Sequence, residues 1–199
     1  MSNMSNIRAL FIYIISCITF SLGATSFILS DLGTDPLDVF CLGVQMHTGW
    51  LIGTIQCAFA LVCLGIWSFL NKKIPPFSTF ITFFLCGYMI DFFRYCLASH
   101  VSDISGIVLM LIGTILCVQG SAGIIISGYG IRAMDLIALS LQDLTKKPFW
   151  IYKGIAEAGL LISGWILGGP VGIGTIIFLL VVGWMIQPVI NLNKKYLNL

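Results

Sequence analysis

The chain has 199 residues, of which 58% are hydrophobic and 9% are charged, and its formal net charge is +2 at pH 7. Soluble domains carry about 25% charged residues, so this chain has too few charges to cover a water-facing surface. The small net charge also argues against nucleic-acid binding. The mean hydropathy of +1.03 and the recurrent long apolar runs, each able to cross about 30 Å of hydrocarbon, predict an all-α integral membrane protein.

Six membrane-spanning helices are predicted, because six segments approach the length and apolar character that a bilayer requires. They cover residues 7–30, 50–70, 76–97, 104–127, 148–168 and 172–190. Two shorter amphipathic stretches, 34–47 and 131–145, follow the first and the fourth span. Nothing in the sequence indicates a soluble domain, so we expect residues 1–199 to form a single transmembrane domain.

The charges between the predicted spans indicate an orientation. With the N-terminus in the cytoplasm, the cytoplasmic segments hold Arg8, Lys72, Lys73, Arg132, Lys146, Lys147, Lys194 and Lys195. The connections on the other side hold Asp31, Asp35, Asp38, Asp103 and both histidines, with no Lys or Arg. Because basic residues resist translocation, we expect a multi-pass protein of the cytoplasmic (inner) membrane with both termini in the cytoplasm.

The two halves of the chain resemble each other. Gly33 and Asp38 recur at a constant offset as Gly130 and Asp135, and the sequence GYMID recurs, after a one-residue slip, as GWMIQ. Each half holds three spans, an odd number, so the second half must be inverted relative to the first. We predict two inverted three-helix repeats, at about 7–97 and 104–193, each with an additional short amphipathic or half-helix. Secondary transporters often have this plan; the alternative is a duplication that simply builds a helix bundle.

Each short stretch begins with helix-start signals. In the first, residues 33–38 read GTDPLD, where Thr34 or Asp35 can cap a helix and Pro36 suits its first turn. In the second, residues 130–135 read GIRAMD. We expect either two interfacial helices that join spans, or a pair of half-helices whose N-terminal dipoles face a ligand.

Four ionisable residues inside the predicted spans are candidate site residues. Asp91 and Arg94 lie three apart in the third span, and Lys153 and Glu157 lie four apart in the fifth, so each pair shares a helix face. A bare charge at mid-membrane costs at least about 3 kcal/mol. Either the pairs are structural salt bridges, or Glu157 is a solute counter-ion or proton carrier and Arg94 holds a carboxylate or phosphate.

The sequence shows no motif for an enzyme, a cofactor or a metal. It has no Ser-His-Asp elbow, zinc-protease helix or nucleotide fingerprint, and none of the seven cysteines has CxxC spacing. The run from Gly164 to Thr175 places Gly164, Gly168 and Gly172 every four residues, a spacing that lets helices approach closely. We expect it to form a tight turn, or a hinge, between the last two spans.

The chain resembles the YczE/YitT-like small bacterial multi-pass membrane proteins. The resemblance rests on residues 33–38 and 130–135, on Lys153 with Glu157, and on residues 168–175, and it covers most of the chain. The chain departs from the family pattern at residues 132–133, where a small residue and Pro often precede the second Asp. The resemblance implies a bacterial cytoplasmic-membrane location, and some members are associated with the production of secondary metabolites.

We predict a secondary transporter for a small polar or zwitterionic organic solute. The candidate binding or coupling residues are Glu157 as counter-ion or proton carrier, Lys153 as its tuning partner, Arg94 and Asp91 as the opposing pair, Asp38 and Asp135 as orienting residues, and Arg132. The expected partners are the lipid bilayer, the solute and a second copy of the chain, because six helices form a thin bundle. The alternative is a non-transporting membrane partner that stabilises or regulates another membrane-associated system, and a passive channel ranks third.

Overall fold

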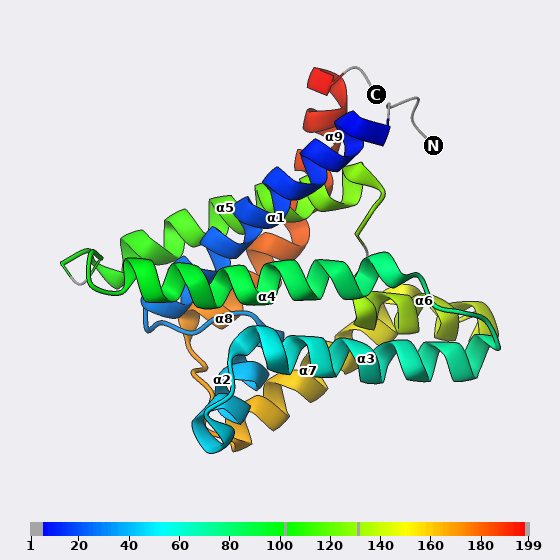
Figure 1. Cartoon of the computed structure of the whole chain (residues 1–199), viewed down its shortest axis with the longest axis horizontal. Coiled ribbons are helices and arrows are strands. Elements are labelled where there is room, and N and C mark those ends of the chain that lie inside the picture. The colour runs from blue at the N-terminus through cyan, green and yellow to red at the C-terminus, as the bar shows by residue number, and fades with distance from the viewer. Residues whose placement is uncertain (1–5, 102, 131, 198–199) are drawn as a thin grey trace.

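The computed structural model describes residues 6–101, 103–130 and 132–197, which form helices joined by short connections (Figure 1). The helices are α1 (Asn6–Leu29), α2 (Pro36–Thr48), α3 (Ile52–Asn71), α4 (Phe77–Leu97), α5 (Gly106–Ser127), α6 (Ala133–Thr145), α7 (Phe149–Ile166), α8 (Ile173–Ile177) and α9 (Gly183–Leu197). A π-helical segment, η1 (Phe178–Val182), joins α8 to α9 without a break. The predicted all-α class is confirmed.

Five helical segments are long and apolar enough to cross a membrane: α1, α3, α4, α5 and the continuous run Ile173–Tyr196 formed by α8, η1 and α9. They lie where five of the spans were predicted. The remaining predicted span, 148–168, is helix α7, which has 18 residues, contains Lys153 and Glu157, and is not among these five segments. The chain is therefore a helical, multi-pass membrane protein.

The short helices α2 and α6 occupy the two predicted amphipathic stretches, and each has 13 residues. Asp35 caps α2, because its side chain accepts a hydrogen bond from the backbone N–H of Asp38 at 2.6 Å. Pro36 occupies the first turn, where its missing N–H costs nothing. Arg132 has the equivalent N-cap position of α6, but its side chain makes no capping hydrogen bond. The start of α6 therefore lacks the side-chain cap that α2 has.

Helices of the two halves pack in matching pairs. α1 lies along α5, and each of them contacts the last helix of its own half, α4 for α1 and α9 for α5. α2 packs on α7, and α6 correspondingly packs on α3. Each short helix therefore lies against a long helix from the other half of the chain.

Local hydrogen bonds also recur at the constant offset seen in the sequence. The Ser30 hydroxyl donates to the Phe27 carbonyl at 2.6 Å, and the Ser127 hydroxyl donates to the Ile124 carbonyl at 2.6 Å. These bonds end α1 and α5 in the same way, immediately before the chain enters each short helix. α2 and α6 also end alike, each followed by a residue in the left-handed region.

The halves differ in the packing of their last two long helices. α3 lies close along α4 because Gly53 faces Gly87, where an added Cβ atom on Gly87 would lie 2.6 Å from the Gly53 Cα atom. Trp150 of α7 stands at the position that corresponds to Gly53, and it is 71% exposed. A Cβ atom on Gly183, the counterpart of Gly87, would meet nothing within 4 Å. Within the described residues α7 and α9 do not pack on each other as α3 and α4 do, and Figure 1 shows them diverging. We refer to the side of the molecule between α7 and α9 as the α7–α9 seam.

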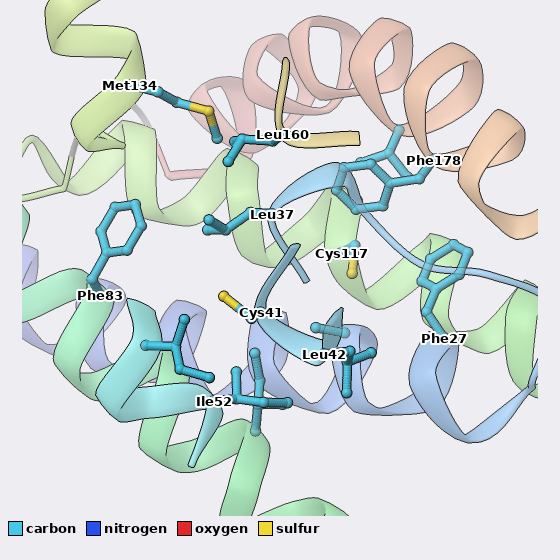
Figure 2. Close-up of a cluster of buried hydrophobic side chains, with 14 of the residues drawn as sticks. Phe27, Leu37, Cys41, Leu42, Ile52, Phe83, Cys117, Met134, Leu160 and Phe178 are labelled. Carbon is cyan, nitrogen blue, oxygen red and sulfur yellow. The ribbon is translucent and has the colours of Figure 1, made fainter. Parts of the chain in front are cut away.

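Helix α2 forms the centre of the main hydrophobic core. Figure 2 shows Leu37, Cys41 and Leu42 of α2 among side chains from the surrounding helices, with Phe83 on one side and Phe27 on the other. All five side chains are buried. The first two turns of α2 are therefore enclosed by other helices of the chain.

The glycine run after α7 forms the predicted turn. Gly168 has φ +86, in the left-handed region that favours glycine. Gly164 lies against the backbone of Phe40, so a Cβ atom there would be 2.5 Å from the Phe40 nitrogen. The N–H of Gly174 donates to the Leu32 carbonyl at 2.7 Å. The run therefore holds α7 and α8 against the connection that leads into α2.

Candidate functional site

Charged side chains gather where the starts of α2 and α6 meet α7. Arg132 lies at the centre of this group. Its guanidinium nitrogens lie 3.8 Å from Asp35 Oδ2, 3.6 Å from Asp135 Oδ2 and 3.4 Å from Glu157 Oε1. One cation thus contacts a carboxylate from each of the three helices, and it links the two halves of the chain.

Lys153 completes the group. Its Nζ atom lies 3.4 Å from Glu157 Oε1 and 3.8 Å from Asp135 Oδ1. The pair that the sequence predicted along α7 is confirmed, and it belongs to a larger network. We call the set Asp35, Arg132, Asp135, Lys153 and Glu157 the charge cluster.

The charge cluster is largely shielded from solvent, and its carboxylates outnumber its cations. The side chain of Asp35 is 5% exposed and that of Glu157 is 16% exposed, whereas Lys153 is 29% exposed. Three carboxylates face two cations, so the fully ionised cluster has an excess negative charge. An excess charge in a low-dielectric interior is costly, and a proton or a cationic group of a ligand would neutralise it.

Asp38 lies outside the charge cluster. Its Oδ1 atom accepts a hydrogen bond from Gln56 Nε2 at 2.9 Å, and its Oδ2 atom has no partner among the described residues. Asp38 and Asp135, which were predicted together to orient the short helices, therefore have different surroundings. The position that holds Lys153 beside Asp135 holds the neutral Gln56 beside Asp38.

The predicted ion pair between Asp91 and Arg94 is not formed. Asp91 accepts hydrogen bonds from the backbone N–H groups of Ile52 at 3.1 Å and Gly53 at 2.8 Å. These donors belong to the first turn of α3, which has no other side-chain cap. Arg94 instead donates from Nη1 to Gln45 Oε1 at 3.0 Å. Each side chain thus contacts a different helix.

Arg94 borders two open hollows away from the charge cluster. One, of about 480 Å³, lies where α1, α4 and the start of α5 meet, and Asp31 also lines it. The other, of about 340 Å³, is lined by Gln45, Asp91 and Arg94 among others. The candidate residues therefore form two groups, the charge cluster and the Arg94 hollows, with Asp38 in neither.

Sequence reasoning identified every member of the charge cluster except Asp35, which it treated only as a helix cap. The internal repeat held the missing signal, because Asp35 corresponds to Arg132 and has the opposite charge. The two residues therefore have complementary charges, and they contact each other in the structure.

Comparisons with known proteins find similar proteins in two bacteria. The chain is 27% identical to the uncharacterized protein YyaS of Bacillus subtilis, over 92% of this chain and 93% of that protein. It is 25% identical to the uncharacterized membrane protein YczE of Bacillus subtilis, over 84% of this chain and 78% of that protein. An uncharacterized protein of Haemophilus influenzae is 24% identical over 84% of this chain and 77% of its own length.

The YczE-like resemblance noted from the sequence motifs is thereby confirmed. No solved structure matches the chain. A model of a family of unknown function, DUF6198, matches residues 7–191, which include every residue of the charge cluster. The chain therefore belongs to the DUF6198 family of YczE-like membrane proteins.

Proposed function

We propose that the protein is a secondary transporter for a small polar or zwitterionic organic solute, which binds at the charge cluster. The observation that carries the proposal is the meeting of two short-helix starts and α7 around five charged side chains inside an otherwise apolar protein. Charges in a membrane interior are expensive and mark solute or ion pathways by default. The proposed function involves no chemical conversion, so the protein is not an enzyme and needs no cofactor.

The matching helix pairs and recurrent hydrogen bonds support two inverted repeats related by an axis in the membrane plane. In this arrangement α7 is the sixth span, and α2 and α6 are re-entrant half-helices that begin near mid-membrane. Transporters built from inverted repeats bind their substrates between such half-helices. The cluster lies at the corresponding place, where Arg132 of one half reaches Asp35 of the other.

The cluster offers complementary groups to a zwitterion. The carboxylates of the cluster outnumber its cations, so an ammonium group of the solute would balance the charge. Of these carboxylates, Glu157 lies nearest to Lys153. Arg132 and the start of α6, which has no side-chain cap, suit a carboxylate. A solute that has both groups would replace internal ion pairs with contacts of its own, and so limit the cost of opening the cluster.

The first test is the thermal stability of the purified protein with a panel of amino acids, organic acids and amines. A ligand that binds only the folded state stabilises it by about 2.7 kcal/mol at a hundredfold excess over its dissociation constant. We expect Glu157→Gln to abolish the stabilisation by a hit compound, and to abolish uptake of that compound into proteoliposomes. Asp143→Asn, on the exposed side of α6, is the matched control and should leave both unchanged. Normal uptake by folded Glu157→Gln protein would remove the charge cluster from the mechanism.

We also propose a cytoplasmic-membrane location with both termini in the cytoplasm. The connection between α3 and α4 carries Lys72 and Lys73, and that between α6 and α7 carries Lys146 and Lys147. Basic residues of short loops stay on the cytoplasmic side. Labelling of an introduced cysteine at Ser99 but not at Lys147 by an impermeant reagent on whole cells, in a chain without native cysteines, tests this orientation.

A second candidate function is that of a non-transporting membrane partner, and the α7–α9 seam favours it. Large apolar side chains such as Trp150 and Trp184 are exposed on the two helices that border the seam. A partner helix from another membrane protein would cover them. Purification of a stoichiometric partner together with the chain, combined with no response of the isolated chain to any solute, would favour this function over transport.

A further inference from the structure

The two aspartates at equivalent positions of α2 and α6 differ in their charge balance. Asp135 has Lys153 at 3.8 Å and Arg132 at 3.6 Å. Asp38 has only the neutral amide of Gln56, at 2.9 Å. None of the ion pairs among the described residues includes Asp38. The molecule therefore contains, within one fold, a neutralised carboxylate and an un-neutralised counterpart.

Asp38 is also the more deeply buried of the two. It is 1% exposed, and its Oδ2 atom is enclosed without a hydrogen-bond partner among the described residues. The flanking Leu37 and Cys41 are part of the main hydrophobic core (Figure 2). An ionised carboxylate in such a place must be paired or lose its charge.

The groups that face Asp38 do not supply a counter-ion at contact distance. Asp35, on the preceding turn, has the same charge and makes a second negative charge beside it costly. Arg94 of α4 and Arg132 of α6 act on Asp38 only from beyond ion-pair distance. Three thiols also interact electrostatically with Asp38, those of Cys41, Cys86 and Cys117.

We propose that Asp38 holds a proton on Oδ2 and that this proton is the coupling ion of the proposed transporter. In the neutral acid, Oδ1 is a carbonyl oxygen that still accepts the Gln56 hydrogen bond. Release of the proton creates a second negative charge at the start of α2, which draws Arg132 toward α2 and away from Glu157. Glu157 then keeps only Lys153 as a cationic partner within the charge cluster, and it can accept a cationic group of the solute in place of Arg132. The inference rests on the proposed function for its role in transport, but the protonation of Asp38 can be tested without a solute.

Infrared spectroscopy of the purified protein tests the protonation directly, through the C=O stretching band of a carboxylic acid at pH 7. We expect the wild-type protein to show such a band and Asp38→Asn to lose the part of its intensity that Asp38 contributes. Gln56→Lys copies the neighbour that Asp135 has, and should remove the band by holding Asp38 ionised although Asp38 itself is unchanged. Asp143→Asn, an exposed carboxylate, should keep the band. Because two different variants are expected to remove the band, misfolding of either one leaves the other as a test.

The pH dependence of stability gives a second readout. A carboxyl that keeps its proton only in the folded state makes the fold less stable as the pH rises above about 4, the ordinary value for Asp. We therefore expect the unfolding temperature of the wild-type protein to fall with rising pH more steeply than that of Asp38→Asn.

A band absent from the wild-type protein, or one as intense in Asp38→Asn as in the wild-type protein, would overturn the assignment. Solute uptake by the wild-type protein together with an absent band would disprove proton coupling through Asp38 and leave the transporter proposal standing. If Asp38→Asn and Gln56→Lys both remove the band and no solute in the panel is taken up, the protonation of Asp38 is established. Only the transporter proposal is then contradicted.

Discussion

Asp35 and Arg132 hold the same N-cap position in the two halves of the chain, and their side chains form an ion pair of 3.8 Å across the junction of α2 and α6. The opposite charges make the two halves unequal at the place where they meet. Asp35 caps its own helix through the N–H of Asp38, so only its other oxygen faces Arg132. Arg132 makes no cap and is free to contact Asp135 and Glu157 as well.

Replacement of Arg132 tests its place at the centre of the charge cluster. Arg132→Gln leaves three carboxylates with a single cation, and breaking a buried ion pair from one side costs about 3 kcal/mol or more. We expect a correspondingly large loss of unfolding free energy. The double variant Asp35→Asn with Arg132→Gln should lose less than the sum of the two single changes. Additive losses would show that the two residues do not interact.

The packing of α3 on α4 predicts a contrast between two equivalent glycines. Gly87→Ala places a Cβ atom 2.6 Å from the Gly53 Cα atom, and overpacking of this kind typically costs about 1–3 kcal/mol. Gly183→Ala meets open space and should be neutral or slightly stabilising, since Ala favours helix. Thermal unfolding in detergent measures both. Equal effects of the two substitutions would contradict the difference between the halves.

Substitution of two turn glycines distinguishes the cost of close packing from the cost of backbone strain. Gly33 has φ +95, and a Cβ atom there would lie within contact of the Gly172 backbone, whereas Gly128 has φ +73 and open space around it. Gly128→Ala should cost only the left-handed strain of about 1–2 kcal/mol. Gly33→Ala should lower the unfolding free energy clearly more, because the start of α8 must also move away from the connection that contains Gly33. Similar unfolding temperatures for the two variants would rule out the close crossing at Gly33.

Because Asp91 caps α3, its replacement is expected to have a modest effect on the unfolding free energy. Asp91→Ala removes the acceptor of two backbone N–H groups, and loss of a helix cap costs about 1 kcal/mol. Asp143→Ala removes an exposed carboxylate of α6 and serves as the control. A loss of several kcal/mol in Asp91→Ala would indicate a further partner for this side chain, such as Arg94.

Local features of the chain were predictable from the sequence, because they depend on neighbouring residues. The apolar runs located the long helices, and the cap chemistry of Asp35 and Pro36 located the start of α2. The i,i+4 spacing likewise gave the pair Lys153 and Glu157. Each of these follows from geometry within a few turns of the chain.

The long-range partners were not predictable from local spacing. Asp91 and Arg94 share a helix face, yet the unpaired N–H groups of α3 bind the first and Gln45 binds the second. Nothing within α4 shows that the start of α3 lies beside Asp91. The meeting of Asp35 with Arg132 likewise depends on how the two halves pack, and only the constant offset between them hinted at it.

The α7–α9 seam has a consequence for how the protein must be handled. Trp150 stands at the position that Gly53 occupies in the first half of the chain, and its side chain is 71% exposed, so no described part of the chain covers this side of α7. Lys153 and Glu157 lie on that helix and are partly exposed. In the proposed arrangement, in which α7 is a membrane span, lipid or detergent forms part of the dielectric surroundings of these charges. A change of detergent or lipid is then expected to alter their ionic contacts as a mutation would.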